Sequence, residues 1–145
     1  MSAEIRRPRD QRERDAAFAL RREVFVGEQG VPADAELDAA DADAVHLVAV
    51  DEDGTVQATC RVLADGVGVM RVGRLCVRAT ARRQGLGAAL LAEAEREARA
   101  AGADVLVMNA QTHALALYES LGYEPCGQRF DEVGIEHLAM EKPLV

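Results

Sequence analysis

Long apolar runs are missing from this chain of 145 residues. No stretch approaches the roughly 18 consecutive apolar residues that a membrane-spanning helix needs. The N-terminal segment, residues 1–14, is rich in charge, which is not the pattern of a secretory signal peptide. We therefore expect a cytoplasmic protein that does not bind a membrane.

Basic charge is also scarce, and lysine is almost absent. The net charge is -8 at pH 7, and the 17 basic residues include a single lysine, Lys142. Nucleic-acid-binding proteins present a basic surface, so this composition argues against a nucleic-acid partner. An acidic, lysine-poor chain suits either a GC-rich genome or a salt-adapted proteome, and the sequence does not separate the two.

The chain has only three cysteines, Cys60, Cys76 and Cys126, which are far apart and odd in number. They form no C-x-x-C pair, and no Cys/His cluster has the spacing of a zinc site. We therefore predict no metal centre. The three thiols are expected to be free, buried and packed as small apolar groups.

The pattern of apolar residues and turn signals predicts one domain over residues 1–145. Asp53-Gly54 and Asp65-Gly66 have the composition of hairpin turns between strands. Strands are expected at residues 3–6, 45–50, 55–63, 67–77, 105–108, 123–130 and 137–141, and helices at residues 10–25, 86–101 and 114–121. The acidic segment 33–44 is expected to be a solvated loop, with a short helical turn as an alternative. The predicted fold class is α/β (α+β), with a mixed, mostly antiparallel sheet of about six to seven strands flanked by helices.

A basic glycine loop, residues 82–87, lies between a strand pattern and a helical pattern. Its glycines let the backbone approach a ligand, and the N–H groups and dipole of the following helix favour an anion. Arg82 and Arg83 add donors suited to phosphate. The loop therefore indicates a phosphate site, although a glycine-softened turn before an ordinary helix has the same composition. A dinucleotide site is disfavoured, because Leu90 stands where the G-x-G-x-x-G pattern has its third glycine.

A second motif carries one of the two tyrosines of the chain, Tyr118. It reads Ala116-Leu117-Tyr118-Glu119-Ser120-Leu121-Gly122-Tyr123 and follows the apolar strand predicted at residues 105–108. Tyr118 is either a reactive group or a core residue whose hydroxyl bonds to a neighbour.

These two motifs together resemble the GNAT superfamily of acetyl-CoA-dependent N-acetyltransferases. The resemblance is carried by Arg82-x-x-Gly85-x-Gly87 and by the tyrosine motif, at this separation. Residues 24–32, 36–38, 43–47, 109–111 and 134–140 are similar to the ElaA/YjcF-type branch. The resemblance extends over nearly the whole chain.

The resemblance implies that acetyl-CoA is the co-substrate, bound where two strands of the sheet splay apart. Backbone groups of Leu75, Cys76 and Val77 would pair with the pantetheine arm. The pyrophosphate would be wrapped by Arg82, Arg83, Gln84, Gly85, Leu86, Gly87 and Ala88. Relatives often have an asparagine seven residues before the tyrosine, where this chain has Gln111, so either Gln111 or Asn109 would contact the cofactor.

The resemblance also implies that Tyr118 protonates the leaving thiolate. An alkylamine is mostly ammonium at neutral pH, so the reaction also needs a base. Glu28 is the candidate, directly or through water, with a purely structural carboxylate as the alternative. His46 is expected to be a satisfied core residue, and His113 and His137 are weaker candidates for the base.

The acceptor is expected to be a small-molecule amine or a protein or peptide amine. The acidic segment 33–44 could attract an ammonium group, although a solvated surface is the more ordinary role of such a run. Family members commonly form homodimers. A domain that binds or senses acyl-CoA without catalysis is the alternative function, and release of free CoA thiol over a panel of amines would separate the two.

Overall fold

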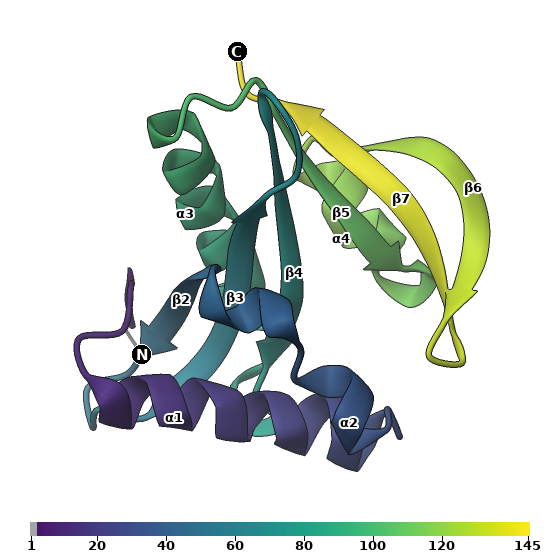
Figure 1. The fold of residues 1–145 in the computed structure, drawn as a ribbon. Coiled ribbons are helices and arrows are strands. Elements are labelled where there is room, and N and C mark those ends of the chain that lie inside the picture. The colour runs from purple at the N-terminus through teal and green to yellow at the C-terminus, as the bar shows by residue number, and fades with distance from the viewer. Residues whose placement is uncertain (1–2) are drawn as a thin grey trace.

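The computed structural model describes residues 3–145 as a mixed seven-stranded sheet with helices on both faces (Figure 1). Residues 1–2, which belong to the predicted domain and to the charged N-terminal segment, lie outside the described residues. The strands are β1 (Glu4–Arg6), β2 (Val45–Val50), β3 (Val56–Ala64), β4 (Val69–Val77), β5 (Val105–Gln111), β6 (Glu124–Glu132) and β7 (Ile135–Pro143). Their order in the sheet is β1-β2-β3-β4-β5-β7-β6, and every neighbouring pair is antiparallel except β4 and β5. The predicted fold class is therefore confirmed.

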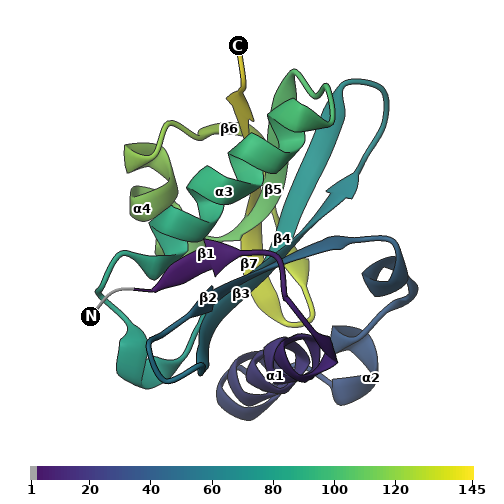
Figure 2. The ribbon, with the colours of Figure 1, turned by 90° about the vertical axis from the view of Figure 1, so that its left-hand side faces the viewer.

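The helices divide between the two faces of the sheet. The α-helices are α1 (Gln11–Arg21), α2 (Ala33–Glu36), α3 (Leu86–Ala100) and α4 (Leu115–Ser120). Figure 2 shows α1 and α2 on one face, and α3 and α4 on the other. No helix among residues 3–145 is long and apolar enough to cross a membrane.

Two apolar layers hold the helices to the sheet. On the α3 face, Leu90 and Leu91 are buried in one cluster with Leu106 of β5. On the α1 face, Leu20 is buried in a second cluster with Val48 of β2. Both faces of the central strands are therefore covered, which explains why β2 reads as an almost continuous apolar run.

The first helix differs from the predicted range of residues 10–25. Asp10 is its N-cap, and the Asp10 side chain accepts a hydrogen bond from the backbone N–H of Glu13. After α1 the chain continues as a wider, π-helical segment, Arg22–Glu28. The helical path therefore continues past Phe25 as far as Glu28, so that one helix reaches from the sheet edge to the neighbourhood of the glycine loop.

The acidic segment 33–44 contains the short helical turns that the sequence allowed, but it is not the solvated surface that was expected. It folds into α2 and a short 3-10 helix, Ala39–Ala42, and it buries the side chains of Glu36 and Asp41. The prediction was wrong because the partners of these carboxylates are arginines on distant elements, α1 and β3, which local composition does not reveal. The thiol prediction was also wrong for Cys126, which is exposed, whereas the other two cysteines are buried.

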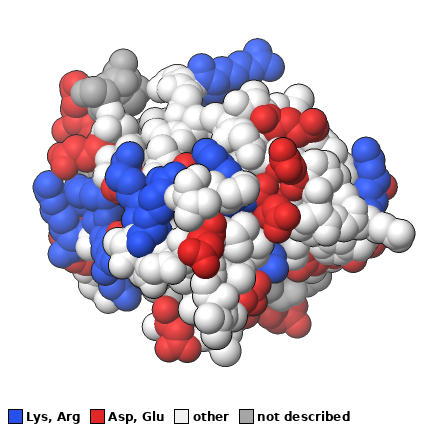
Figure 3. All heavy atoms as spheres, turned by 90° about the horizontal axis from the view of Figure 1, so that it is seen from above, with Lys and Arg blue, Asp and Glu red and all other residues white. Residues whose placement is uncertain are grey.

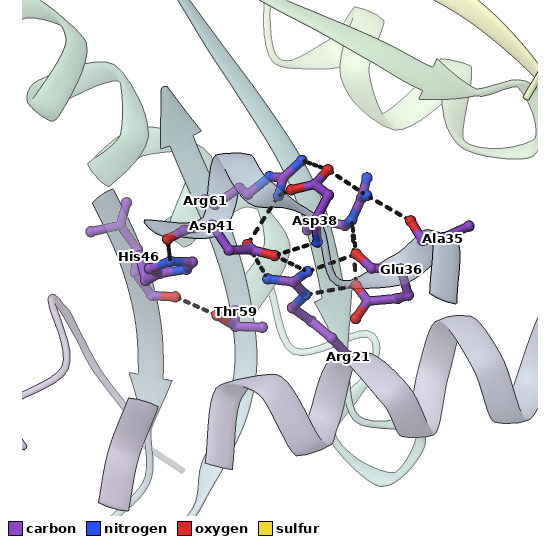
Figure 4. Close-up of polar contacts among 10 residues, drawn as sticks. Arg21, Ala35, Glu36, Asp38, Asp41, His46, Thr59 and Arg61 are labelled. Atoms are coloured by element: carbon purple, nitrogen blue, oxygen red, sulfur yellow. Dashed lines mark hydrogen bonds and ion pairs between the residues drawn. The ribbon is translucent and has the colours of Figure 1, made fainter. Parts of the chain in front are cut away.

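An ion network joins this segment to the sheet (Figure 4). It consists of Arg21, Glu36, Asp38, Asp41, Arg61 and Arg74. Arg21 donates to Glu36 and Asp41, each at 2.7 Å, and Arg61 donates to Asp38 at 2.6 Å and to Asp41 at 2.9 Å. Burial alone would raise the pKa of Asp41, but the hydrogen bonds from these guanidinium groups hold that pKa well below its usual range.

His46 of β2 belongs to the interior, as expected. The residue is 7% exposed, and its Nε2 lies 2.9 Å from the backbone oxygen of Asp41. The ring also meets Phe18 edge to face, with centroids 5.2 Å apart.

The sheet parts between β4 and β5, as the family resemblance implied. The two strands pair only where Val69–Arg71 lie beside Val105–Val107. Beyond that point β4 remains paired with β3, and β5 remains paired with β7. A bulge bends β4 at Arg74, which has a left-handed φ of 53°. The side chain of Arg74 bonds to the backbone oxygen of Glu36, so the ion network holds the bulge.

Candidate active site

A groove of about 680 Å³ opens where β4 and β5 part. It contains nearly all the residues that were proposed for a site from the sequence, although these come from five different segments of the chain. Those that line it are Glu28, Leu75, Cys76, Val77, Arg82, Arg83, Gly85, Leu86, Gly87, Ala88, Asn109, Gln111 and Tyr118. Gln84 is exposed and does not line the groove.

The glycine loop places an uncapped helix end at one end of the groove. Gly85 is the N-cap of α3 with a φ of 80°, and no side chain caps the helix. Arg83 also has a left-handed φ, of 65°. Alternating backbone conformations of this kind direct successive N–H groups to one side, and the dipole of the 15-residue helix favours negative charge there. This end of the groove can therefore hold an anion.

The parted edge of β4 forms one wall of the groove. Val77 at its end accepts a hydrogen bond from Arg82 Nε at 3.0 Å, which fixes the loop to the strand. Burial raises the pKa of the Cys76 thiol to about 12, so this thiol stays protonated at neutral pH and is a poor nucleophile.

Tyr118 of α4 lines the opposite wall. Its ring packs edge to face against Tyr123, with centroids 6.4 Å apart. Burial, and to a lesser extent the neighbouring Cys60, raises the pKa of Tyr118 above its ordinary value. The phenol is therefore protonated at neutral pH and can donate a proton. Tyr123 itself is buried and donates to Glu95 at 3.0 Å, a supporting role that the sequence did not reveal.

Glu28 lines the groove and is bonded to the glycine loop. It ends the π-helical segment, and its Oε1 lies 2.9 Å from an Nη atom of Arg82. Both side chains are partly exposed, at 38% and 42%. The candidate base is therefore also bonded to the glycine loop that is the candidate phosphate site.

The two amides of β5 have different surroundings. Gln111 exchanges two side-chain hydrogen bonds with Gln29, at 2.9 and 3.2 Å. The Oδ1 of Asn109 accepts a hydrogen bond from Arg71 at 3.1 Å. Either amide lines the groove, and each is held in place by a neighbour on another element.

His137 of β7 also lines the groove, although the sequence ranked it below Glu28. Its position depends on the pairing of β7 with β5, where His137 lies directly across from Gln111. No local pattern in the sequence predicts that pairing. Among residues 3–145, no three His, Cys, Asp or Glu side chains are grouped so that they could hold a metal ion.

Comparison with known proteins identifies the kind of site. Residues 9–144 match the acetyltransferase (GNAT) domain. The chain belongs to this family. Over 127 residues it is 37% identical to YjcF, an uncharacterized N-acetyltransferase of Bacillus subtilis (strain 168), covering 87% of this chain and 89% of YjcF.

Solved structures agree with this assignment. An acyl-CoA N-acyltransferase from Pseudomonas aeruginosa has a TM-score of 0.85 and 31% identity, with 97% of this chain and 99% of that chain covered. Escherichia coli ElaA has a TM-score of 0.83 and 24% identity, with 97% and 98% covered, a likeness of fold. The predicted resemblance to the ElaA/YjcF-type branch is confirmed, and this GNAT protein is an acyltransferase.

Proposed function

We propose that this GNAT protein transfers an acetyl group directly from acetyl-CoA to a primary amine. The observation that carries the proposal is the groove between the parted strands β4 and β5, which ends at the uncapped N-terminus of α3. An extended, flexible arm with a pyrophosphate at its end fits a groove of this shape and polarity. The acyl-CoA N-acyltransferase from Pseudomonas aeruginosa, at 31% identity, supports acyl-CoA as the donor.

In this proposal the cofactor occupies most of the groove. Backbone N–H groups from Arg82 to Ala88 would wrap the pyrophosphate, with the two arginines of the loop adding charge. Backbone groups of Leu75, Cys76 and Val77 would bond to the pantetheine arm, as a peptide strand bonds to a sheet edge. Asn109 or Gln111 would donate to the cofactor from β5. The proposal needs no metal.

Tyr118 would be the general acid of the reaction. Its position in the groove and its raised pKa support this role, because the phenol must keep its proton until the thiolate leaves. The proton then passes to the sulfur atom of CoA as the carbon–sulfur bond breaks.

Glu28 would be the general base, directly or through water. Its place in the groove supports the assignment. The ion pair with Arg82 supports the alternative, in which Glu28 holds the glycine loop in position. Replacement of Glu28 by glutamine separates the two roles, because a loss of acetyl-CoA affinity indicates the positioning role and a loss of turnover alone indicates the base.

The acceptor would be a small-molecule amine or a protein or peptide amine, and not a nucleic acid. The face shown in Figure 3 carries acidic and basic side chains side by side, in keeping with the net charge of -8. A cytoplasmic location stays a prediction from the sequence, and a homodimer stays an expectation from the family resemblance.

Two measurements on the wild-type protein test the proposal. Calorimetry should detect binding of acetyl-CoA, and a thiol assay should detect release of CoA when amines of a broad panel are added. Binding without turnover over the whole panel would indicate the alternative, a domain that senses acyl-CoA. A failure to bind acetyl-CoA would overturn both functions.

A further inference from the structure

His137 lies in the wall of the groove, in the middle of three paired strands. It is paired with Gln111 of β5 on one side and with Phe130 of β6 on the other. The ring of Phe130 stacks on the imidazole, with centroids 5.8 Å apart and an angle of 22° between the planes. The residue lines the groove and is only 6% exposed. A polar ring is therefore held rigidly at an almost fully buried position.

One hydrogen bond fixes the tautomer of this ring. The Nδ1 of His137 lies 2.7 Å from the backbone oxygen of Ile135. A carbonyl oxygen only accepts hydrogen bonds, so the neutral imidazole carries its hydrogen on Nδ1 and presents a lone pair on Nε2. No residue of 3–145 donates a hydrogen bond to that Nε2. The ring thus has an unused proton acceptor in the groove wall.

The other acid–base groups in the groove differ from His137 in this respect. Most already have polar partners on the protein: Glu28 with Arg82, Glu36 with Arg21 and Arg74, and His113 with Gln111. Glu132 also lines the groove, but it is exposed and lies next to the turn of the β6–β7 hairpin. A group that takes a proton from a bound amine needs a free lone pair and a fixed orientation, and His137 has both.

We propose that His137 Nε2 is the catalytic proton acceptor for the amine, an inference that rests on the proposed acetyl transfer. Glu28 then has the positioning role, through Arg82. Nε2 takes one proton from the ammonium group, and the imidazolium later releases it to water. The nitrogen lone pair attacks the thioester carbon, a carbon–nitrogen bond forms and the carbon–sulfur bond breaks. The thiolate takes the proton of Tyr118, and the proton lost by the new amide nitrogen returns to Tyr118.

The variant His137→Asn tests the proposal, because an asparagine amide can still donate to the backbone oxygen of Ile135 while the Nε2 lone pair is lost. For an alkylamine we expect kcat/KM to fall by about 10²–10⁴-fold, with the affinity for acetyl-CoA unchanged by calorimetry. The wild-type pH profile should rise through an ionisation that the variant lacks. The groups that face the ring are Phe130, Gln111 and the Ile135 carbonyl. The titratable and charged groups elsewhere in the groove are Glu28, Glu36, Arg61, Arg71, Arg74, Cys76, Arg82, Arg83, His113, Tyr118 and Glu132.

His46 provides a matched control for the loss of a buried histidine. It is also almost fully buried, bonded to one backbone oxygen and in contact with one phenylalanine ring, but it does not line the groove. His46→Asn should lower stability and leave the turnover of the folded protein unchanged. Equal losses of turnover in the two variants would mean that His137 is merely structural.

A pair of amines of equal size sharpens the test. Ethylamine is mostly ammonium at neutral pH, whereas methoxyamine is mostly neutral and needs no base before it attacks. The loss in His137→Asn should be large for ethylamine and should shrink at least tenfold for methoxyamine. If kcat/KM falls equally for both amines, or if the variant turns over ethylamine fully, the role of His137 is overturned and the proposed acetyl transfer is not. Absence of turnover by the wild-type protein overturns the proposed function and this inference with it.

Discussion

Arginine and carboxylate side chains have two different roles around β4, one in the buried ion network and one at the glycine-loop end of the groove. In the ion network, the Arg21 side chain is 2% exposed and its donors are bonded to Glu36 and Asp41. In the groove, Arg82 and Glu28 form one partly exposed pair beside a helix end that has no cap. Buried polar groups are almost always bonded in native proteins, and the ion network follows this rule and supports the fold. The exposed N–H groups at the start of α3 have no side-chain cap, so they are open to an anion.

Of the substitutions compared, the one at the N-terminus of α3 is expected to have the largest effect, a loss of acetyl-CoA binding. Gly85→Asp places a side chain on a left-handed backbone and a negative charge against the proposed pyrophosphate. We expect acetyl-CoA binding to be lost altogether in calorimetry, with only a modest fall in the thermal unfolding temperature. The φ of 80° is strained for a residue that carries a Cβ atom, but no atom within 4 Å clashes with that Cβ. Normal affinity in this variant would contradict the phosphate site.

Tyr118→Phe removes a proton from the groove without removing the ring. We expect turnover to fall by about 10²–10⁴-fold, the range for a lost general acid, with acetyl-CoA binding preserved. Steady-state kinetics and calorimetry on the same preparation measure the two quantities. Unchanged turnover would exclude Tyr118 from the mechanism.

Arg21→Met tests the ion network. The variant leaves Glu36 and Asp41 buried without their main partner, and breaking a buried pair in this way costs about 3–5 kcal/mol of unfolding free energy. Urea denaturation at neutral pH measures the loss. Arg96→Met is the control, since Arg96 forms only an exposed pair with Glu93 and should cost less than about 1 kcal/mol. Similar losses of unfolding free energy in the two variants would mean that burial of the ion network does not increase its contribution to stability.

The smallest effect is expected for Glu13 in the first turn of α1, and it is a change in how stability depends on pH. Hydrogen bonds from Arg6 and from the backbone of Arg9 lower the pKa of Glu13 to about 2, from 4.5. The unfolded chain therefore binds a proton before the folded protein does, so stability is lost as the pH falls from about 5 towards 2. In Glu13→Gln the contribution of Glu13 to this loss of stability should disappear. Urea denaturation between these pH values should therefore show an unfolding free energy that changes less with pH. Parallel profiles for variant and wild type would contradict the assignment.

The sequence predicts well whatever depends on near neighbours. The turns at Asp53-Gly54 and Asp65-Gly66 and the glycine loop before α3 were placed correctly because turn and cap chemistry is local. The burial of Asp41 was missed because its partners, Arg21 and Arg61, are each 20 residues away along the chain.

In the candidate site too, residues in short local motifs were predicted, whereas His137, which is placed by distant strand pairing, was ranked only as a weaker candidate. The glycine loop and Tyr118 belong to short motifs, so the sequence could propose them together. His137 depends on the register between β5 and β7, a contact set by the whole sheet, and its fixed tautomer depends on a carbonyl of its own strand. Three-dimensional pairing is therefore needed to distinguish it from His46, which the sequence presents in much the same way.

The short junction between β4 and β5 suggests that the enzyme could be cut into two fragments that reassemble. Three residue pairs join two half-sheets, and each half-sheet is continuous in sequence, with β1 to β4 before α3 and β5 to β7 after it. A cut in the turn between α3 and β5 would yield two fragments that each carry one wall of the groove. Acetyl transfer would then require their reassembly, so the activity of the mixture would report how strongly the two fragments bind each other.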